Sequence, residues 1–555
     1  MQTRHLTETL LVSSQLAVAD VAAAAAQGVR SIINNRPDGE SPDQPSSAEI
    51  EAAATAMGLG YRHIPIVPGQ VRDEDVTSFD TALAELGAPV LAFCRTGTRS
   101  TTLWALGQAG SQPADAIAAR AEAAGHDLKS LPPRLEQRAE KRRQARVGER
   151  VDVVITGGGS AGLATAASLR RRAPDLNIVV IEPRTEHFYQ PGWTMVGRGI
   201  FDRHATCRPE ASVIPKGVRW IKAAVASFEP EHDQVTLEDG SAIGYRALVV
   251  APGIALDWAA IDGLPETLGQ NGVTSNYSYE TAPYTWELVQ SLREGVALFT
   301  QPPMPIKCAG GPQKAMYLSC DFWRRTGRLA NIEVTFHNAG AVLFGVKEYV
   351  PPLMRYVESY GIHLAFDSRL IAVDGPARRA TFKTPDGEVT KSFNMLHVCP
   401  PHKAPEFVAK SPLADQAGYV EVDPATLRHV RHTNIFGLGD GGSTPNSKTM
   451  AAARKQAPIV AENLLAMFAG REPTAIYDGY GSCPLTVERG KIVLAEFGYG
   501  GKLLPSFPKW LIDGTKPQRL SWLLKSEALP WIYWNGMLKG REWLARPRHR
   551  DTAAA

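Results

Sequence analysis

The sequence sets a cysteine between two lysines in a stiff loop. Residues 301–314 read QPPMPIKCAGGPQK, so Cys308 directly follows Lys307 and stands shortly before Lys314. The thiolate is the nucleophilic form of cysteine, and a nearby ammonium group lowers the pKa of the thiol. Burial in an apolar core does not explain a cysteine surrounded by prolines. We therefore predict that Cys308 performs sulfur chemistry.

A second cysteine, Cys94, lies between an apolar strand and a helical segment. Residues 93–100 read FCRTGTRS, and residues 101–108 have helical character. Backbone N–H groups and the start of a helix stabilise a thiolate at such a junction. Arg99 follows after a loop whose size suits one sulfane sulfur better than a tetrahedral phosphate.

A dinucleotide-binding fingerprint begins at residue 151. An apolar strand, 151–155, runs into the sequence GGGSAG and then into a helical segment, 163–172. Glycines permit a tight turn there and let backbone N–H groups approach a pyrophosphate at the helix N-terminus. A second apolar strand ends in an acidic residue that can accept hydrogen bonds from a ribose. The predicted contacts are Gly157, Gly159, Ser160, Ala161, Gly162 and Glu182.

The expected second nucleotide domain lacks such a fingerprint. Its first strand, 295–299, leads directly into the proline-rich loop of Cys308. Proline has no N–H group, so this loop is unsuited to cradle a pyrophosphate. NADH is therefore not the expected reductant.

The composition and the order of the segments indicate an α/β protein of several domains. The net charge of +3 gives no reason to expect nucleic-acid binding, and six cysteines in 555 residues are no disulfide framework. We predict no metal site. The expected parts are a phosphatase-like or rhodanese-like α/β domain (1–125), a charged linker or solvated helix (126–150), two Rossmann-like domains (151–470, the second inserted at about 280–400) and an aromatic-rich segment (471–555).

The larger part of the chain resembles the sulfide–quinone oxidoreductases of the mitochondrial-like type. The resemblance spans about residues 150 to 545, and its motifs occur in order along the whole stretch. They are YQP at 189–191, IKCAG at 306–310, PQK at 312–314, YDGY at 477–480 and CP at 483–484. It implies an FAD enzyme that oxidises hydrosulfide at a redox-active cysteine pair beside the flavin.

Two further segments resemble those that hold the flavin in proteins with two dinucleotide domains. The first, YRALVVAPG at 245–253, resembles the strand and turn that return to the first domain. The second, NIFGLGD at 434–440, resembles the strand whose last residue holds the ribityl chain of the flavin. Behind them, NSKT at 446–449 starts a helix whose N-terminus favours the reduced, anionic flavin. These segments add Gln190, Ala251, Gly253, Asp440 and Lys448 to the predicted cofactor contacts.

One position departs from the family. The family usually carries its second cysteine directly after the GD pair, where this chain has Gly441. We consider Cys399, at a strand end, as the substitute, with a packed core cysteine as the alternative. Cys320, on an expected helix, is interpreted as a core residue, and we assign no chemistry to Cys207 or Cys483.

Residues 1–120 resemble a phosphatase-like domain found fused to sulfide-metabolising enzymes, and the Cys94 loop resembles those of rhodaneses and tyrosine phosphatases. Phosphatases have a histidine directly before the cysteine, where this chain has Phe93. Their arginine also follows the cysteine one residue later than Arg99 follows Cys94. Our hypothesis is that Cys94 accepts sulfane sulfur from Cys308 and delivers it to a small thiol, sulfite or cyanide. The alternatives are a regulatory binding module and a tyrosine-phosphatase-like hydrolase with Asp38 as general acid, although a turn is the plainer interpretation of Asp38.

The last 85 residues hold five of the eleven tryptophans, interleaved with lysine and arginine. Together with Phe497, Tyr499 and Phe507 they offer flat aromatic surface for a quinone. The composition of 520–524 and 529–538 is typical of an interfacial anchor, with a closed core or a homodimer interface as the alternative. We expect a cytoplasmic protein, peripheral to the inner (plasma) membrane, without a signal peptide or a transmembrane helix. The rival interpretation is a type II NADH–quinone dehydrogenase.

Overall fold

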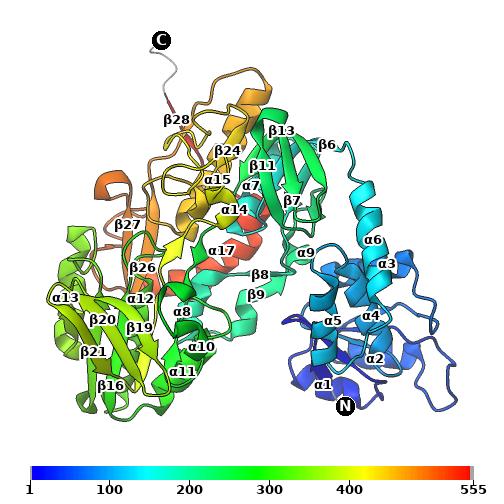
Figure 1. Cartoon of the computed structure of the whole chain (residues 1–555). Coiled ribbons are helices and arrows are strands. Elements are labelled where there is room, and N and C mark those ends of the chain that lie inside the picture. The colour runs from blue at the N-terminus through cyan, green and yellow to red at the C-terminus, as the bar shows by residue number, and fades with distance from the viewer. Residues whose placement is uncertain (1–2, 551–555) are drawn as a thin grey trace. The chain divides into compact units, whose positions relative to one another are not determined.

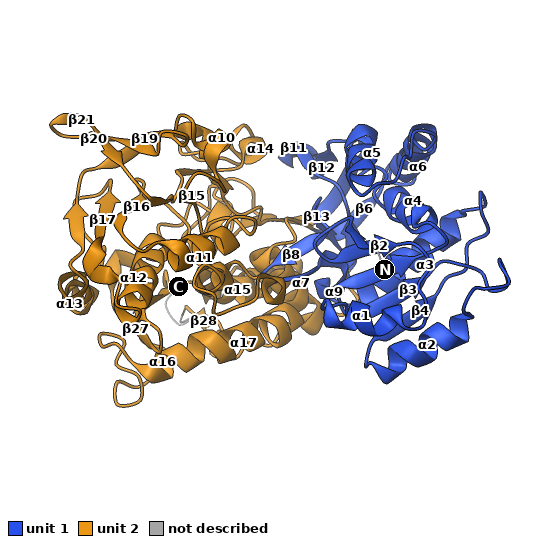
Figure 2. Ribbon diagram, turned by 90° about the horizontal axis from the view of Figure 1, so that it is seen from below, with its two compact units in different colours: residues 1–154, 177–188, 207–246 blue, residues 155–176, 189–206, 247–555 orange. Residues whose placement is uncertain are grey.

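The computed structural model describes residues 3–550. The chain divides into two compact units, which Figure 2 colours separately. One unit comprises residues 1–154, 177–188 and 207–246, and the other comprises residues 155–176, 189–206 and 247–555. Strands and helices alternate in both units (Figure 1), which confirms the predicted α/β class.

The N-terminal domain, blue to cyan in Figure 1, is a sheet with helices on both faces. Its strands are β1 (Thr3–His5), β2 (Leu10–Ser13), β3 (Ser31–Asn34), β4 (Gly60–His63) and β5 (Val90–Phe93), in the order β1-β2-β5-β3-β4. Its helices are α1 (Asp20–Ala26), α2 (Ser47–Ala56), α3 (Asp73–Glu85), α4 (Thr98–Gly107), α5 (Ala114–Ala123) and α6 (Pro132–Gln144). Side chains alternate along a strand, so Val90 and Ala92 pack with α3 to α6, whereas Leu91 and Phe93 pack with α1 and α2.

The charged segment 126–150, expected as a linker or a solvated helix, contains α6. Leu135 of this helix is buried in the core of the N-terminal domain. Arg138 and Lys141 form ion pairs with Asp73 at the start of α3. The segment is therefore fastened to the N-terminal domain along one face of its helix.

The fingerprint segment belongs to a seven-stranded sheet. Its strands are β6 (Arg150–Thr156), β7 (Ile178–Ile181), β10 (Arg219–Ile221), β11 (Val225–Glu229), β12 (Gln234–Leu237), β13 (Ala242–Val250) and β24 (Ile435–Gly437). The order is β10-β7-β6-β13-β12-β11, and β24 pairs with β13 in parallel. Helix α7 (Ser160–Arg172) follows β6, and α15 (Met450–Phe468) packs against α7. The loops after β6, β13 and β24 carry the three predicted flavin motifs.

The second nucleotide domain has a five-stranded parallel sheet of order β15-β22-β16-β17-β18. Its strands are β15 (Val273–Thr274), β16 (Gly295–Gln301), β17 (Ile332–Asn338), β18 (His363–Ala365) and β22 (Met395–His397). Helices α11 (Ala282–Ser291), α12 (Gly311–Arg325) and α13 (Val350–Tyr360) accompany it, as does an antiparallel sheet of β19 (Arg369–Asp374), β20 (Arg379–Thr384) and β21 (Gly387–Ser392). The loop with Cys308 joins β16 to α12.

The C-terminal segment adds a hairpin and a set of short helices. Strands β26 (Gly481–Glu488) and β27 (Lys491–Phe497) pair in antiparallel fashion, and the hairpin shares one apolar core with α12. Helix α16 (Arg519–Leu523), a π-helical turn (Leu524–Ala528) and α17 (Leu529–Asn535) follow. Among residues 3–550, no helix has the length and apolar character that crossing a membrane requires.

Candidate active site

Cys308 is held in a constrained backbone conformation between β16 and α12. Its φ of 53° lies in the left-handed region, which costs a non-glycine residue about 1–2 kcal/mol. The Cys308 amide donates to the Lys448 carbonyl at 2.7 Å, and the Cys308 carbonyl accepts from the Gly311 amide at 2.6 Å. The Tyr277 hydroxyl donates to the same carbonyl at 3.3 Å. These bonds fix the backbone while the side chain stays half-buried.

A second thiol lies directly against Cys308. The Sγ atoms of Cys308 and Cys483 are 3.3 Å apart. Cys483 is on β26, where the alternate residues Cys483, Leu485 and Val487 face the core shared with α12. Gly310 makes room for this contact, because a Cβ atom at that position would lie 2.6 Å from the Cys483 Sγ. The hairpin therefore delivers a thiol that the sequence analysis left without chemistry.

Positive charge surrounds the two thiols. The Lys314 ammonium donates to the Cys308 Sγ at 2.9 Å. The hydrogen bond from the Cys483 thiol, followed by Lys314, holds the pKa of Cys308 well below its ordinary value. The same hydrogen bond raises the pKa of Cys483. These shifts favour the thiolate form at Cys308 and the protonated form at Cys483.

Lys525 is a second functional candidate, after Cys483, that the sequence analysis missed. It lies on the π-helical turn of the C-terminal segment and is only 5% exposed. Burial, followed by repulsion from Lys314, lowers the pKa of Lys525 to about 7, and attraction to Cys308 and Cys483 opposes that shift. A lysine among tryptophans and leucines gives no signal of such burial in the sequence.

The other cysteines of this unit are buried. Cys399 packs with Tyr277 and Ile306, and its thiol is directed to the Pro400 carbonyl at 3.8 Å. Burial raises the pKa of both Cys399 and Cys320. The structure therefore places Cys483 against the Cys308 sulfur. Cys399 instead packs against Ile306, which belongs to the same loop as Cys308.

The three flavin motifs lie against one another. A Cβ atom on Gly162 would be 1.9 Å from the Gly157 carbonyl oxygen, so the first turn of α7 admits only glycine there. A Cβ atom on Gly157 would be 2.4 Å from the Ala251 carbonyl oxygen, in the turn after β13. A Cβ atom on Gly439, next to Asp440, would be 2.9 Å from Ala161. These close approaches bring the backbones of the three motifs into contact with one another.

Several other residues predicted to contact the cofactor form hydrogen bonds with neighbouring residues of the protein. Gly159 is the N-cap of α7, and the Ser160 hydroxyl is 2.8 Å from the Tyr533 hydroxyl of α17. Gln190 accepts a hydrogen bond from Lys307 at 2.7 Å. Glu182 follows β7 and accepts from the backbone amide two residues further on.

The segment after β24 has the polar character that a flavin ring requires. Burial raises the pKa of Asp440, against the opposing charges of Lys448 and Lys307, while the nearby Cys308 raises it further. Buried polar atoms normally have hydrogen-bond partners. Among the described residues, three buried oxygens of this segment have none: Thr444 Oγ1, Asn446 Oδ1 and Ser447 Oγ. These residues therefore fit the polar edge of a bound isoalloxazine.

Gly441, the position of the family's second cysteine, is closely surrounded. A Cβ atom there would lie 2.9 Å from the Gly253 carbonyl oxygen and 3.2 Å from the ring of Pro252. Contacts below 3.0 Å force a shift of the backbone. A cysteine at this position would therefore require the turn after β13 to move.

The N-terminal thiol has its own local environment. Cys94 follows β5, is fully buried, and accepts a hydrogen bond from the Gly97 amide at 3.2 Å. Gly97 has a φ of 88° and caps α4, so the loop presents a backbone donor to the sulfur at the start of a helix. This is the junction that the sequence analysis predicted.

The polar residues beside this loop form ion pairs. Arg99 donates to Glu40 at 2.9 Å, and Arg36 donates to the same carboxylate at 2.6 Å. Those bonds, Arg99 first, lower the pKa of Glu40. Asp38 accepts from the amide and the hydroxyl of Ser47, both at 2.7 Å, at the start of α2. Asp38 itself stands in a turn, which was the plainer interpretation of that residue, and its carboxylate is tied to the start of α2.

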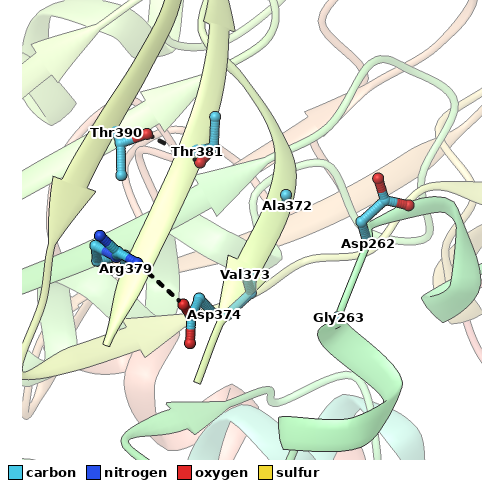
Figure 3. Close-up of a pocket in the computed structure, with 8 residues that line it drawn as sticks. All are labelled: Asp262, Gly263, Ala372, Val373, Asp374, Arg379, Thr381 and Thr390. Carbon is cyan, nitrogen blue, oxygen red and sulfur yellow. Dashed lines mark hydrogen bonds and ion pairs between the residues drawn. The ribbon is translucent and has the colours of Figure 1, made fainter. Parts of the chain in front are cut away.

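A pocket of about 550 Å³ lies at the antiparallel sheet, and Figure 3 shows the residues that line it. Arg379 and Asp374 form an ion pair of 3.3 Å on its wall, and the hydroxyls of Thr381 and Thr390 are 3.1 Å apart. Asp262 and Gly263 complete the rim. The lining holds no cysteine, so we attach no sulfur chemistry to it.

Comparison with known proteins identifies the family. The model described as pyridine nucleotide-disulphide oxidoreductase matches residues 151–457, more than half of the chain. The chain therefore belongs to the pyridine nucleotide-disulphide oxidoreductase family. Within that family it is similar to the mitochondrial sulfide:quinone oxidoreductase of Dictyostelium discoideum, at 43% identity over 71% of this chain and 87% of the relative.

The fold and the N-terminal domain have relatives of their own. The X-ray structure of the sulfide:quinone oxidoreductase from Aquifex aeolicus shares the fold with a TM-score of 0.59, at 21% identity over 70% of this chain and 92% of that chain. The model of the phosphatase-like domain of beta-lactamase hydrolase-like protein matches residues 2–111. The beta-lactamase hydrolase-like protein of Agrobacterium fabrum is 40% identical over 20% of this chain and 25% of its own length.

Proposed function

We propose that this chain oxidises sulfide to sulfane sulfur at Cys308 and passes the electrons through FAD to a quinone. The observation that carries the proposal is the position of Cys308. Its thiolate lies on a proline-rich loop hydrogen-bonded to Lys448 of the flavin motif, with the Lys314 ammonium 2.9 Å from the sulfur. The similarity to sulfide:quinone oxidoreductases over 71% of the chain supports the same conclusion.

The residues of the site have separate tasks in this proposal. Lys314 keeps Cys308 ionised, and an ionised cysteine is also a good leaving group when an acceptor removes sulfur from it. The half-exposed side chain of Cys308 gives hydrosulfide and a small thiol, sulfite or cyanide access to the sulfur. The raised pKa of Cys483 keeps a proton available beside it.

FAD is the cofactor that these residues fit. Gly157, Gly162 and Ala251 would hold its pyrophosphate turn, and Asp440 its ribityl chain. The unpaired oxygens after β24 would bind the pyrimidine edge, and the N-terminus of α15 would favour negative charge there. When bound, FAD supplies two-electron acceptance from a thiol and electron transfer to a quinone.

An NADH-dependent dehydrogenase is the second candidate and is less well supported. The loop after β16 contains three prolines before Cys308, namely Pro302, Pro303 and Pro305. The loop therefore offers few amides to a pyrophosphate. Reduction of the flavin by NADH, and not by sulfide, would favour that candidate.

The C-terminal segment is proposed to contact the quinone and the membrane that carries it. Trp531 and Trp543 stack with ring centroids 5.7 Å apart. Soluble proteins rarely expose many large apolar side chains in one segment. Those exposed here are Leu503, Trp510, Leu511, Leu520, Leu523, Trp531, Trp543 and Leu544. Binding to vesicles of bacterial phospholipid, lost when three of these residues become serine, tests the contact.

For the N-terminal domain we propose sulfur transfer through Cys94. The Gly97 amide at the start of α4 stabilises a charged or persulfidated sulfur. Arg99 is paired with Glu40 and is therefore not held ready for a phosphate dianion. A Cys94→Ser variant should keep sulfide-dependent quinone reduction and lose sulfur transfer from thiosulfate to cyanide. Hydrolysis of an aryl phosphate would support the phosphatase alternative.

Anaerobic mixing with sulfide tests the main proposal. We expect sulfide to bleach the flavin absorbance of the native protein and a short-chain quinone to restore it. Cys308→Ser should retain the flavin but show no bleaching, whereas the control Cys320→Ser should behave like the native protein. A flavin that stays oxidised in the native protein with sulfide would refute the proposal.

A further inference from the structure

Two arginines and one glutamate lie beside the Cys94 loop, at the carboxyl ends of parallel strands. Strand β5 lies between β2 and β3 and pairs with both in parallel. The amide of Asn35, directly after β3, donates at 2.8 Å to the carbonyl of Phe93, the residue before Cys94. Arg36 is the next residue along that segment, and Arg99 lies in the first turn of α4. Ligands of open α/β sheets bind at this end of the strands.

The guanidinium groups of both arginines are already engaged inside the protein. Arg36 donates from Nε to the Glu40 carboxylate at 2.6 Å. Its two terminal nitrogens donate to Gln15 and Ser41, both at 2.8 Å. Arg99 donates to the same Glu40 oxygen at 2.9 Å and to a backbone carbonyl at 2.7 Å. Neither guanidinium group is therefore held open for an incoming anion.

Glu40 leaves one polar atom for a ligand. Its Oε2 accepts from both arginines, whereas its Oε1 is buried and has no hydrogen-bond partner among the described residues. A buried carboxylate oxygen without a partner is costly, and a hydrogen-bond donor removes that cost. The S–H group of a thiol brings such a donor, whereas a dianion brings two negative charges towards the carboxylate.

We propose that Glu40 determines the substrate class of the Cys94 site, which favours small thiols as sulfur acceptors and disfavours dianions such as phosphate and thiosulfate. This inference rests on the proposed sulfur transfer through Cys94. Two guanidinium groups and one carboxylate leave one net positive charge in the cluster instead of two. A site discriminates between ligands by repelling the wrong one as well as by attracting the right one.

The transfer to a thiol balances without an oxidant or a reductant. The sulfur of the acceptor thiol bonds to the outer sulfur of the Cys94 persulfide, and the bond between that outer sulfur and Cys94 breaks. The electron pair of the broken bond stays on Cys94 as a thiolate, whose sulfur accepts from the Gly97 amide at 3.2 Å. The proton of the acceptor thiol is released to solvent. Glu40 contributes before this step, by holding the S–H group of the acceptor.

Anion binding tests the proposal without turnover. Equilibrium dialysis of the full-length holoprotein against radiolabelled inorganic phosphate compares the native chain with three variants. We expect Glu40→Gln to bind phosphate about 10-fold more tightly than the native protein, because one opposing charge is lost. Glu40→Asp keeps the charge, and Glu85→Gln removes a carboxylate that pairs with Arg62 at 2.8 Å in the same domain, so both should bind phosphate as the native protein does.

Three results of the dialysis would overturn the proposal. The first is equal phosphate binding by the native protein and Glu40→Gln. The second is equal phosphate binding by Glu40→Asp and Glu40→Gln, since the two variants share the loss of native packing and differ in charge. The third is phosphate binding that persists when Arg99→Met is added to Glu40→Gln, because the anion then lies elsewhere.

The preference between substrates provides the second measurement. Sulfur transfer from thiosulfate to 2-mercaptoethanol is followed by the release of sulfite, and the rate of Cys94→Ser is subtracted. In Glu40→Gln we expect the KM for thiosulfate to fall about 10-fold and the KM for 2-mercaptoethanol to rise about 5-fold, with kcat within about 2-fold. A merely structural role moves both KM values in the same direction, and that result would also overturn the proposal. If the native protein shows no Cys94-dependent transfer, the proposed sulfur transfer fails, while the phosphate comparison still decides the role of Glu40.

Discussion

Replacing Lys314 by methionine removes one charge from the site while keeping the length of the side chain. Lys314 Nζ lies 2.9 Å from the Cys308 Sγ, and the ammonium favours the ionised form of the thiol. A hydrogen bond to a charged group contributes about 1.5–3 kcal/mol, which corresponds to about 1–2 pKa units. We therefore expect the Cys308 pKa to rise by that amount in Lys314→Met.

Alkylation of Cys308 measures this change directly. Only the thiolate reacts with iodoacetamide, so the rate follows the ionised fraction as pH is varied. Because the native pKa is depressed, the native rate should stay high as pH falls through neutrality. The Lys314→Met rate should begin to fall at a higher pH and, below both pKa values, be about 10- to 100-fold lower. The reaction is followed in the reduced protein on the peptide that contains Cys308.

Lys525→Met is the control for a general effect of charge. Lys525 contributes less to the low pKa of Cys308 than Lys314 does, so its replacement should shift the alkylation profile less. If the native and Lys314→Met profiles coincide, or if Lys525→Met shifts the profile as much, the local hydrogen bond does not control the thiolate and the reasoning is wrong.

Three glycine substitutions test the packing around the thiols. Gly310→Ala places a Cβ atom 2.6 Å from the Cys483 Sγ, so we expect a loss of about 1–3 kcal/mol in the free energy of unfolding, measured by chemical denaturation. Gly441→Cys should lower the melting temperature, because a Cβ atom there would lie 2.9 Å from the Gly253 carbonyl oxygen; an unchanged melting temperature would contradict this. Gly97→Ala forces a side chain onto a φ of 88° and to within 2.6 Å of the His126 ring, so thiosulfate–cyanide transfer should be lost while sulfide-dependent quinone reduction persists.

The sequence was sufficient to predict the α/β class and the local settings of several site residues. The glycine fingerprint, the helix that starts at Met450 and the junction at Cys94 all follow from short-range patterns, since turns, caps and helix starts depend on residues close together in the chain. The structure of the charged segment 126–150 was harder to predict from the sequence. The leucines that pack α6 against the N-terminal domain are few, and most of the surrounding residues are charged.

The sequence by itself determined that a thiol occupies the loop after β16, and that this loop is poor in backbone donors. Only the tertiary structure decided what lies against that thiol. Cys483 and Lys525 are distant from Cys308 in sequence. Cys483 meets Cys308 because the hairpin of β26 and β27 shares a core with α12, and the charge of Lys525, on a π-helical turn, acts on the Cys308 thiol. Alternation along a strand predicts which residues share a face, but the helix that the face covers depends on long-range packing. For that reason a cysteine without an evident role in the sequence became the partner of the reactive one.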